Sequence, residues 1–180
     1  MYTRLMDEYL PAIRREVEQH YYLFDEFTLR QDYEGSCHRD TRCIFLRGPA
    51  GVNERTTVID EYTFFHCMTF DDWDHRRLFP TVNRLIADVM QSNRYTELGW
   101  VTVVSLLPHG VIVPHIDEGD YCARFNRYHY PIISDNALFI VGDICQKPKP
   151  GELFVYDNQL VHSAINMGDN ERIHLIFDAI

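Results

Sequence analysis

The stretch WVTVVSLLPHGVIVPHID, residues 100–117, determines the fold class expected for this chain. Two runs rich in β-branched and other apolar residues flank the turn-forming sequence Pro108-His109-Gly110. Short apolar runs bounded by Pro and Gly are typical of β-strands joined by a brief connection. We therefore predict strands over residues 100–107 and 111–115.

Runs of the same kind continue from there to the C-terminus. They predict strands over residues 127–132, 137–141, 152–156, 160–166 and 172–178. Clusters of turn-forming residues separate these runs at 134–136, 147–151 and 167–170. Seven short strands with brief connections indicate an antiparallel sandwich or barrel. We expect a mainly β fold with flanking helices, as a double-stranded β-helix (jelly roll, cupin-like).

The first 99 residues have a helical and mixed character. Apolar residues recur every three or four positions between residues 3 and 22, which predicts an amphipathic helix that begins or kinks near Pro11. The same spacing follows Pro80 and predicts a second helix that ends near Asn93. At 180 residues the chain has the size of one domain. We expect residues 1–180 to form one domain, with its functional site in the β-rich part, residues 100–180.

Composition and charge exclude two classes of partner. The formal net charge of the chain is −10, and acidic residues are spread along the sequence. Binding to a phosphate backbone needs a clustered basic surface instead. No stretch approaches the roughly 20 apolar residues that a membrane-spanning helix requires. We expect no nucleic-acid partner and no membrane partner.

The five cysteines are scattered, odd in number and contain no C-x-x-C pair. This pattern favours a reduced, cytoplasmic setting over a disulfide framework. Cys37, His38 and Cys43 lie close enough in sequence to suggest a zinc knuckle, but no second ligand pair at comparable spacing accompanies them.

The predicted strand at 111–115 leads into His115-Ile116-Asp117. Residues i and i+2 of a strand point to the same face, so the imidazole and the carboxylate converge. His162 lies in another predicted strand. Two histidines and one carboxylate form a facial triad, which holds iron(II) and leaves positions open for other ligands.

The H-x-D pattern by itself has low specificity, since the chain contains a second copy at His38-Arg39-Asp40. That copy lies in a polar segment between Gly35 and Arg42. We interpret it as an exposed loop or, alternatively, as a loop that faces the substrate. The downstream copy lies among strands with His162 and is the predicted metal site.

Arg172 opens the last predicted strand, ten residues after His162. A dicarboxylate such as 2-oxoglutarate needs a fixed cation at its far end, and a guanidinium group binds a carboxylate through two parallel hydrogen bonds. Arg172 is the predicted partner of that carboxylate.

The stretch from Ser105 to Asp178 resembles the aspartyl/asparaginyl β-hydroxylase family of iron(II)- and 2-oxoglutarate-dependent dioxygenases. The resemblance runs in order through Ser105-Leu106-Leu107-Pro108-His109-Gly110, Pro114-His115, Arg127-Tyr128-His129, Gly151-Glu152, Tyr156-Asp157, His162, Asn166, Arg172 and Ile176-Phe177-Asp178. An ordered series of this length is far more specific than H-x-D alone.

The resemblance implies an iron(II) ion held by His115 and His162. The family's carboxylate ligand is not universal among its members, but Asp117 is present here, which favours a full triad.

For the cosubstrate, the resemblance implies that Arg172 pairs with the distal carboxylate of 2-oxoglutarate and that Ser105 assists by hydrogen bonding. Arg127 and His129 would lie near the end of the cosubstrate that binds iron.

The reaction implied is hydroxylation of an amino-acid side chain by dioxygen, with release of succinate and carbon dioxide. The substrate would be a peptidyl aspartyl or asparaginyl residue or a free amino acid. Two alternatives stay open at this point: a metal-binding cupin-type isomerase or hydrolase, and a non-catalytic binding or sensor domain on the same fold.

Overall fold

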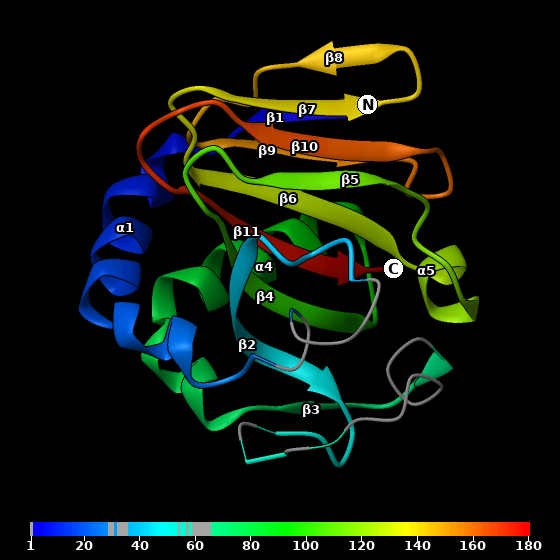
Figure 1. Cartoon of the computed structure of the whole chain (residues 1–180). Coiled ribbons are helices and arrows are strands. Elements are labelled where there is room, and N and C mark those ends of the chain that lie inside the picture. The colour runs from blue at the N-terminus through cyan, green and yellow to red at the C-terminus, as the bar shows by residue number, and fades with distance from the viewer. Residues whose placement is uncertain (1, 29–30, 32–35, 54, 57, 59–65) are drawn as a thin grey trace.

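The computed structural model describes residues 2–28, 31, 36–53, 55, 56, 58 and 66–180. In this part of the chain the strands form two antiparallel sheets (Figure 1). The larger sheet, in spatial order, consists of β1 (Tyr2–Leu5), β9 (Glu152–Tyr156), β6 (Asn126–Ile133), β11 (Arg172–Ala179), β4 (Leu98–Leu106), β2 (Thr41–Pro49) and β3 (Phe70–Asp72). The smaller sheet consists of β5 (Val111–His115), β10 (His162–Asn166), β7 (Ala137–Val141) and β8 (Ile144–Gln146).

The two sheets pack face to face as a double-stranded β-helix, the jelly-roll architecture expected from the sequence. An apolar cluster joins Leu106, Phe154 and Tyr156 of the larger sheet to Phe139 and Ala164 of the smaller one. Both sheets therefore contribute to one inner layer, and the site described below lies beside it.

Helices α1 (Leu10–Gln19) and α4 (Pro80–Asn93) cover the other face of the larger sheet, with the short 3-10 helices η1 (Asp7–Tyr9), η2 (Tyr21–Asp25) and η3 (Asp74–Leu78) nearby. The short helix α5 (Asp120–Arg124) lies elsewhere and packs against Trp100 of β4, which lines the pocket face. A proline occupies the first turn of both α1 and α4, where its missing N–H costs nothing. Ile13 of α1 and Leu85 of α4 are fully buried in one cluster with Leu175 and Phe177 of β11. Each such side chain stabilises the fold by about 1.5–3 kcal/mol. No described helix is both long enough and apolar enough to cross a membrane.

Strand alternation divides the residues of β11 between two environments. Ile173, Leu175 and Phe177 belong to the cluster under the helices. Arg172 and His174 therefore point the other way, into the space between the sheets, as the period of two in a strand requires. All eight residues of β11 except Ile176 are buried, so its polar side chains lie inside the protein.

The strands predicted from residue 100 onward correspond to β4, β5, β6, β7, β9, β10 and β11, and β5, β7 and β9 have the predicted bounds. The predicted helix at residues 80–93 is α4.

The helix expected over residues 3–22 is confirmed only from Leu10. Residues 2–5 instead form β1, which pairs with β9, because backbone hydrogen bonds to a sheet edge outweigh a helical apolar spacing. Strand β2 was not predicted, although Cys43-Ile44-Phe45-Leu46 is a continuous buried apolar run typical of a strand covered on both faces.

Candidate active site

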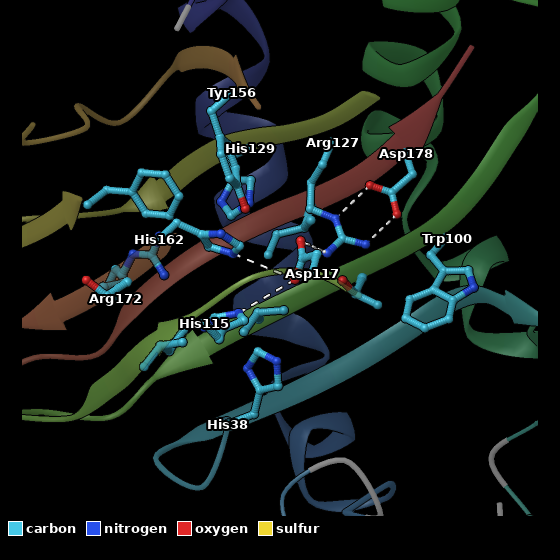
Figure 2. A pocket seen from close by; sticks show the side chains of 17 residues that line it. His38, Trp100, His115, Asp117, Arg127, His129, Tyr156, His162, Arg172 and Asp178 are labelled. Carbon is cyan, nitrogen blue, oxygen red and sulfur yellow. Dashed lines mark hydrogen bonds and ion pairs between the residues drawn. The ribbon is translucent and has the colours of Figure 1, made fainter. Parts of the chain in front are cut away.

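A pocket opens between the inner faces of the two sheets (Figure 2). His115 ends β5, Asp117 follows in the next connection, and His162 begins β10. Because β5 and β10 are antiparallel neighbours with His115 opposite His162, the two imidazoles lie side by side, 4.3 Å between ring centroids. The predicted H-x-D…H set is thus brought together by one strand pair.

The three side chains present one ligand atom each to a common point. Nε2 of His115 lies 3.6 Å and Nε2 of His162 lies 3.7 Å from Oδ1 of Asp117. Each Nδ1–H donates a hydrogen bond to a backbone carbonyl, that of Val113 at 2.8 Å and that of Leu160 at 3.0 Å. With each Nδ1 donating to a carbonyl, each Nε2 is the nitrogen that faces Asp117, which is the orientation a metal-binding histidine needs. This donor set fits a divalent iron ion.

The charges around the triad keep its carboxylate ionised. Burial would raise the pKa of Asp117, but the positive charge of Arg127 and the two histidines hold that pKa well below its usual range. Burial would lower the pKa of His115, but its interactions with the Asp117 carboxylate and with Cys37 raise that pKa to about 10. Burial lowers the pKa of His162. A proton on His115 thus occupies the position that a metal takes when it binds.

Arg127 on β6 holds Asp117 in place. Its Nη1 contacts Asp117 Oδ2 at 2.5 Å, while its Nε and Nη2 form a two-pronged pair with Asp178 of β11 at 2.9 and 2.8 Å. Asp178 also accepts a hydrogen bond from the hydroxyl of Tyr121 at 2.6 Å. Arg127 therefore has its charge satisfied by two carboxylates. Arg127 lies beside the carboxylate of the predicted triad, and its predicted place near the cosubstrate stays a prediction.

Arg172 lies in the same pocket, but its charge is not balanced by carboxylates as that of Arg127 is. It is 2% exposed, and among the described residues no carboxylate pairs with it. Its Nη2 donates to Nδ1 of His174 at 2.8 Å, and its Nε has no partner. Burial lowers the pKa of Arg172 to about 10, so the guanidinium stays cationic at neutral pH. A buried cation without a counter-ion is costly, and an anionic ligand would relieve that cost.

His129 on β6 is the second polar group in the pocket without a partner. Within the described part of the chain neither ring nitrogen makes a hydrogen bond, although the ring is buried and stacks on Phe154. Burial and the nearby Arg172 hold the pKa of His129 well below its usual range. A neutral imidazole offers one donor and one acceptor, so His129 can donate to a ligand carboxylate.

Ser105 does not reach the pocket. On β4 it lies opposite Ile173, whereas Arg172 lies opposite Leu106, so Ser105 shares the face of Ile173 and points toward the helices. Its hydroxyl donates to Glu171 at 2.8 Å. The prediction that Ser105 assists Arg172 is therefore wrong, because the strand register places the two side chains on opposite faces of the sheet.

His38 and Asp40, the polar residues of the upstream H-x-D copy, have different environments. His38 lines the pocket, and its ring centroid lies 5.6 Å from that of His115 (Figure 2). Asp40 instead accepts a hydrogen bond from the backbone N–H of Val111 at 2.9 Å. The interpretation as a loop facing the substrate side is therefore the one supported for His38. Cys43 is buried in an apolar cluster with Phe45 and Trp73, so it is no partner of Cys37 in a knuckle.

Asp178 and Tyr121 were not assigned a function from the sequence. Asp178 lies at the end of β11, an even number of residues from Arg172, and this alternation would have placed it on the pocket face. Tyr121 gave no such signal, because it reaches Asp178 from the separate helix α5.

Comparisons with solved structures show the same fold. A prolyl hydroxylase from Trichoplax adhaerens, in complex with a hypoxia inducible factor peptide fragment, superposes with a TM-score of 0.62 at 12% identity, covering 99% of this chain and 82% of that chain. The viral collagen prolyl hydroxylase of Paramecium Bursaria Chlorella virus-1, in its 2OG complex, gives a TM-score of 0.56 at 12% identity, covering 99% and 96%. No curated protein sequence matches the chain.

The family model for aspartyl/asparaginyl beta-hydroxylases matches residues 8–180, nearly the whole chain and well beyond the stretch of the resemblance. Together with the jelly roll and the converging His115, Asp117 and His162, this match is decisive: the chain belongs to the aspartyl/asparaginyl beta-hydroxylase family.

Proposed function

We propose that this chain is an iron(II)- and 2-oxoglutarate-dependent dioxygenase that hydroxylates an amino-acid side chain and releases succinate and carbon dioxide. One observation carries the proposal: the same pocket contains three convergent metal-ligand atoms and a buried guanidinium that pairs with no carboxylate of the described residues. A cupin that only binds metal has no use for Arg172. We also propose that residues 1–180 form one domain and that the protein works in a reduced, cytoplasmic setting.

His115, His162 and Asp117 would hold the iron through Nε2, Nε2 and a carboxylate oxygen. The carbonyls of Val113 and Leu160 fix the imidazole orientation in advance. Arg127 occupies the outer oxygen of Asp117, and this leaves Oδ1 toward the histidines. The chain thus determines ligand geometry before any metal binds.

Arg172 and His129 would bind the cosubstrate. Arg172 would pair with the distal carboxylate, and His129 would donate to a carboxylate oxygen nearer the metal. Both groups are buried and lack the partners that buried polar groups require, so binding satisfies them. Phe139 and Tyr156 line the pocket beside His129, and their rings would help to exclude bulk water.

When bound, iron and 2-oxoglutarate supply the oxidising power of the reaction by activating dioxygen. The chain's own contribution is geometry, charge balance and exclusion of water. No nucleophilic side chain is required of it.

The substrate class we propose is an aspartyl or asparaginyl residue of a peptide, or a free amino acid. The family's name supports the first, and the Trichoplax prolyl hydroxylase was solved with a peptide fragment. We do not assign Arg42 and Arg47 to substrate binding, because their charges are already paired. Arg42 pairs with Asp25 and Glu171, and Arg47 pairs with Asp72.

Metal binding tests the first half of the proposal. We expect the protein to bind one manganese(II), an iron surrogate, and His162→Ala to weaken binding on the order of 100-fold or more, since even outer contacts of a metal ligand are worth 10–100-fold. His38→Ala is the matched control and should retain manganese. Retention by His162→Ala together with loss in His38→Ala would refute the triad assignment.

Succinate release tests the second half. Iron-loaded protein incubated with 2-oxoglutarate and a panel of free amino acids and acidic peptides should release succinate faster with one class of substrate. Stimulation by a carboxylate- or carboxamide-bearing compound would support the proposal. Stimulation only by an apolar small molecule would overturn the substrate class.

A further inference from the structure

The turn that carries Cys37 and His38 is fixed against the metal-binding strand. Asp40 accepts backbone N–H hydrogen bonds from Leu107 and Val111, both at 2.9 Å, through its carbonyl and its carboxylate respectively. The backbone N–H and the hydroxyl of Thr41 donate to the carbonyl of His38 at 3.0 and 2.8 Å. These contacts tie the turn to the connection that precedes β5. Cys37 and His38 are therefore held beside His115.

Cys37, His38 and His115 each offer one ligand atom, and these atoms lie within 4.8 Å of one another. A zinc ion binds sulfur at about 2.3 Å and imidazole nitrogen at about 2.0–2.1 Å in tetrahedral geometry. Small side-chain rotations would bring the three atoms to those distances. All three residues are half-buried, so an ion can reach them from solvent.

His115 has only one nitrogen available for both sites. Its Nδ1–H donates to the carbonyl of Val113, so Nε2 carries the free lone pair. The same Nε2 faces Asp117 in the triad. One lone pair binds one metal ion, so the two sets of ligands exclude each other.

The two sets differ in the metal they prefer. The triad offers two imidazoles and a carboxylate, a combination suited to iron(II) and manganese(II). The set containing Cys37 offers two imidazoles and a thiolate, which favours zinc(II) and other thiophilic ions. Cys37 would bind as thiolate and release its proton to solvent.

We propose that Cys37, His38 and His115 form a second metal site, for zinc(II), that competes with the iron triad for His115. Filling this site removes one ligand from the triad and switches the catalytic site off. The competition depends on the proposed iron site, whereas zinc binding by these three residues does not.

Cobalt(II), a zinc surrogate with visible spectra, isolates the second site in the full chain. In His162→Ala the triad is broken and the proposed ligands are intact. Titration should then produce a thiolate-to-cobalt charge-transfer band that saturates at one equivalent. The band should be absent in His162→Ala/Cys37→Ser and present in His162→Ala/Cys145→Ser, a matched control at an exposed cysteine. A folded His162→Ala protein without the band, or a band that survives Cys37→Ser, would overturn the site.

Competition is measured by manganese electron paramagnetic resonance in the otherwise unmodified protein. Zinc(II) should release bound manganese, and Cys37→Ser should require at least about 10-fold more zinc for half release. Equal zinc requirements would overturn the competition. If the unmodified protein does not bind manganese at all, that result contradicts only the proposed iron site. The cobalt band of His162→Ala then still tests the second site.

Discussion

Arg127 and Arg172 are two buried arginines in one pocket, and they differ in what surrounds their charge. Arg127 is held by Asp117 and Asp178. The Arg172 side chain donates a hydrogen bond to the neutral His174, and within the described part of the chain no carboxylate pairs with it. Both lie on neighbouring strands of the larger sheet and point to the same inner face.

We interpret Arg127 as a charge that positions Asp117, and we propose that Arg172 is a charge that binds a ligand. The charge of Arg127 is balanced by two carboxylates, so it does not need an anionic ligand, and its contacts hold Asp117 in place. A buried guanidinium without an acid is destabilising in the free protein, and its retention points to a ligand that supplies the missing charge. Four measurements distinguish these two roles.

Asp178→Asn should cause the largest loss of stability. It removes one carboxylate from a buried pair and leaves part of the Arg127 charge unbalanced, which typically costs about 3–5 kcal/mol. Urea denaturation of the metal-free protein measures the free energy of unfolding. Asp169→Asn, at a fully exposed carboxylate, is the control and should change little. Equal stability of both variants would show that Arg127 does not depend on Asp178.

Arg172→Ala should weaken 2-oxoglutarate binding by about 2–5 kcal/mol, or at least about 30-fold, because it leaves a carboxylate unpaired in a desolvated pocket. Arg172→Lys should be intermediate, since it keeps the charge and loses the two-pronged geometry. Calorimetric titration into manganese-loaded protein gives both affinities. Manganese binding should survive in both variants, and equal 2-oxoglutarate affinities would remove Arg172 from the site.

The metal-free protein should lose stability as the pH falls below about 6.5. Burial holds the pKa values of His129 and His174 well below their usual range, so the unfolded chain binds protons there that the folded protein does not. Each histidine should contribute about 1.4 kcal/mol per pH unit below 6.5, down to its pKa in the folded protein.

Denaturation at pH 7, 6 and 5 measures this slope, and His129→Phe should reduce it. The raised pKa of His115 acts in a different window, because its stabilisation is complete below 6.5 and is lost as the pH rises toward 10. An unchanged slope in His129→Phe would mean that this imidazole is protonated in the folded protein.

Ser105→Ala should have the smallest effect. Loss of its hydrogen bond to Glu171 should cost about 0.5–1.5 kcal/mol of stability. The 2-oxoglutarate affinity of the manganese-loaded protein should not change. A drop comparable to that of Arg172→Lys would show that Ser105 turns toward the pocket and would contradict the register of β4 and β11.

The triad and Arg172 could be predicted from the sequence because their signals are local. His115 and Asp117 have the spacing of one strand face, and His162 and Arg172 lie in recognisable strands of their own. The strands from residue 100 onward could be predicted for the same reason. Residues 2–5 and β2 could not be placed with equal certainty, because their partners lie far away in sequence.

The strand pattern, the candidate metal-ligand set and the candidate cation for a dicarboxylate follow from residue type and short spacing in the sequence. Which arginine is already paired, which face Ser105 occupies and where His38 lies depend on the folded arrangement. The physical reason is register: a shift of one residue between β4 and β11 reverses the face of every side chain. Charge balance around Arg127 likewise depends on Asp117 and Asp178, which approach it from different elements.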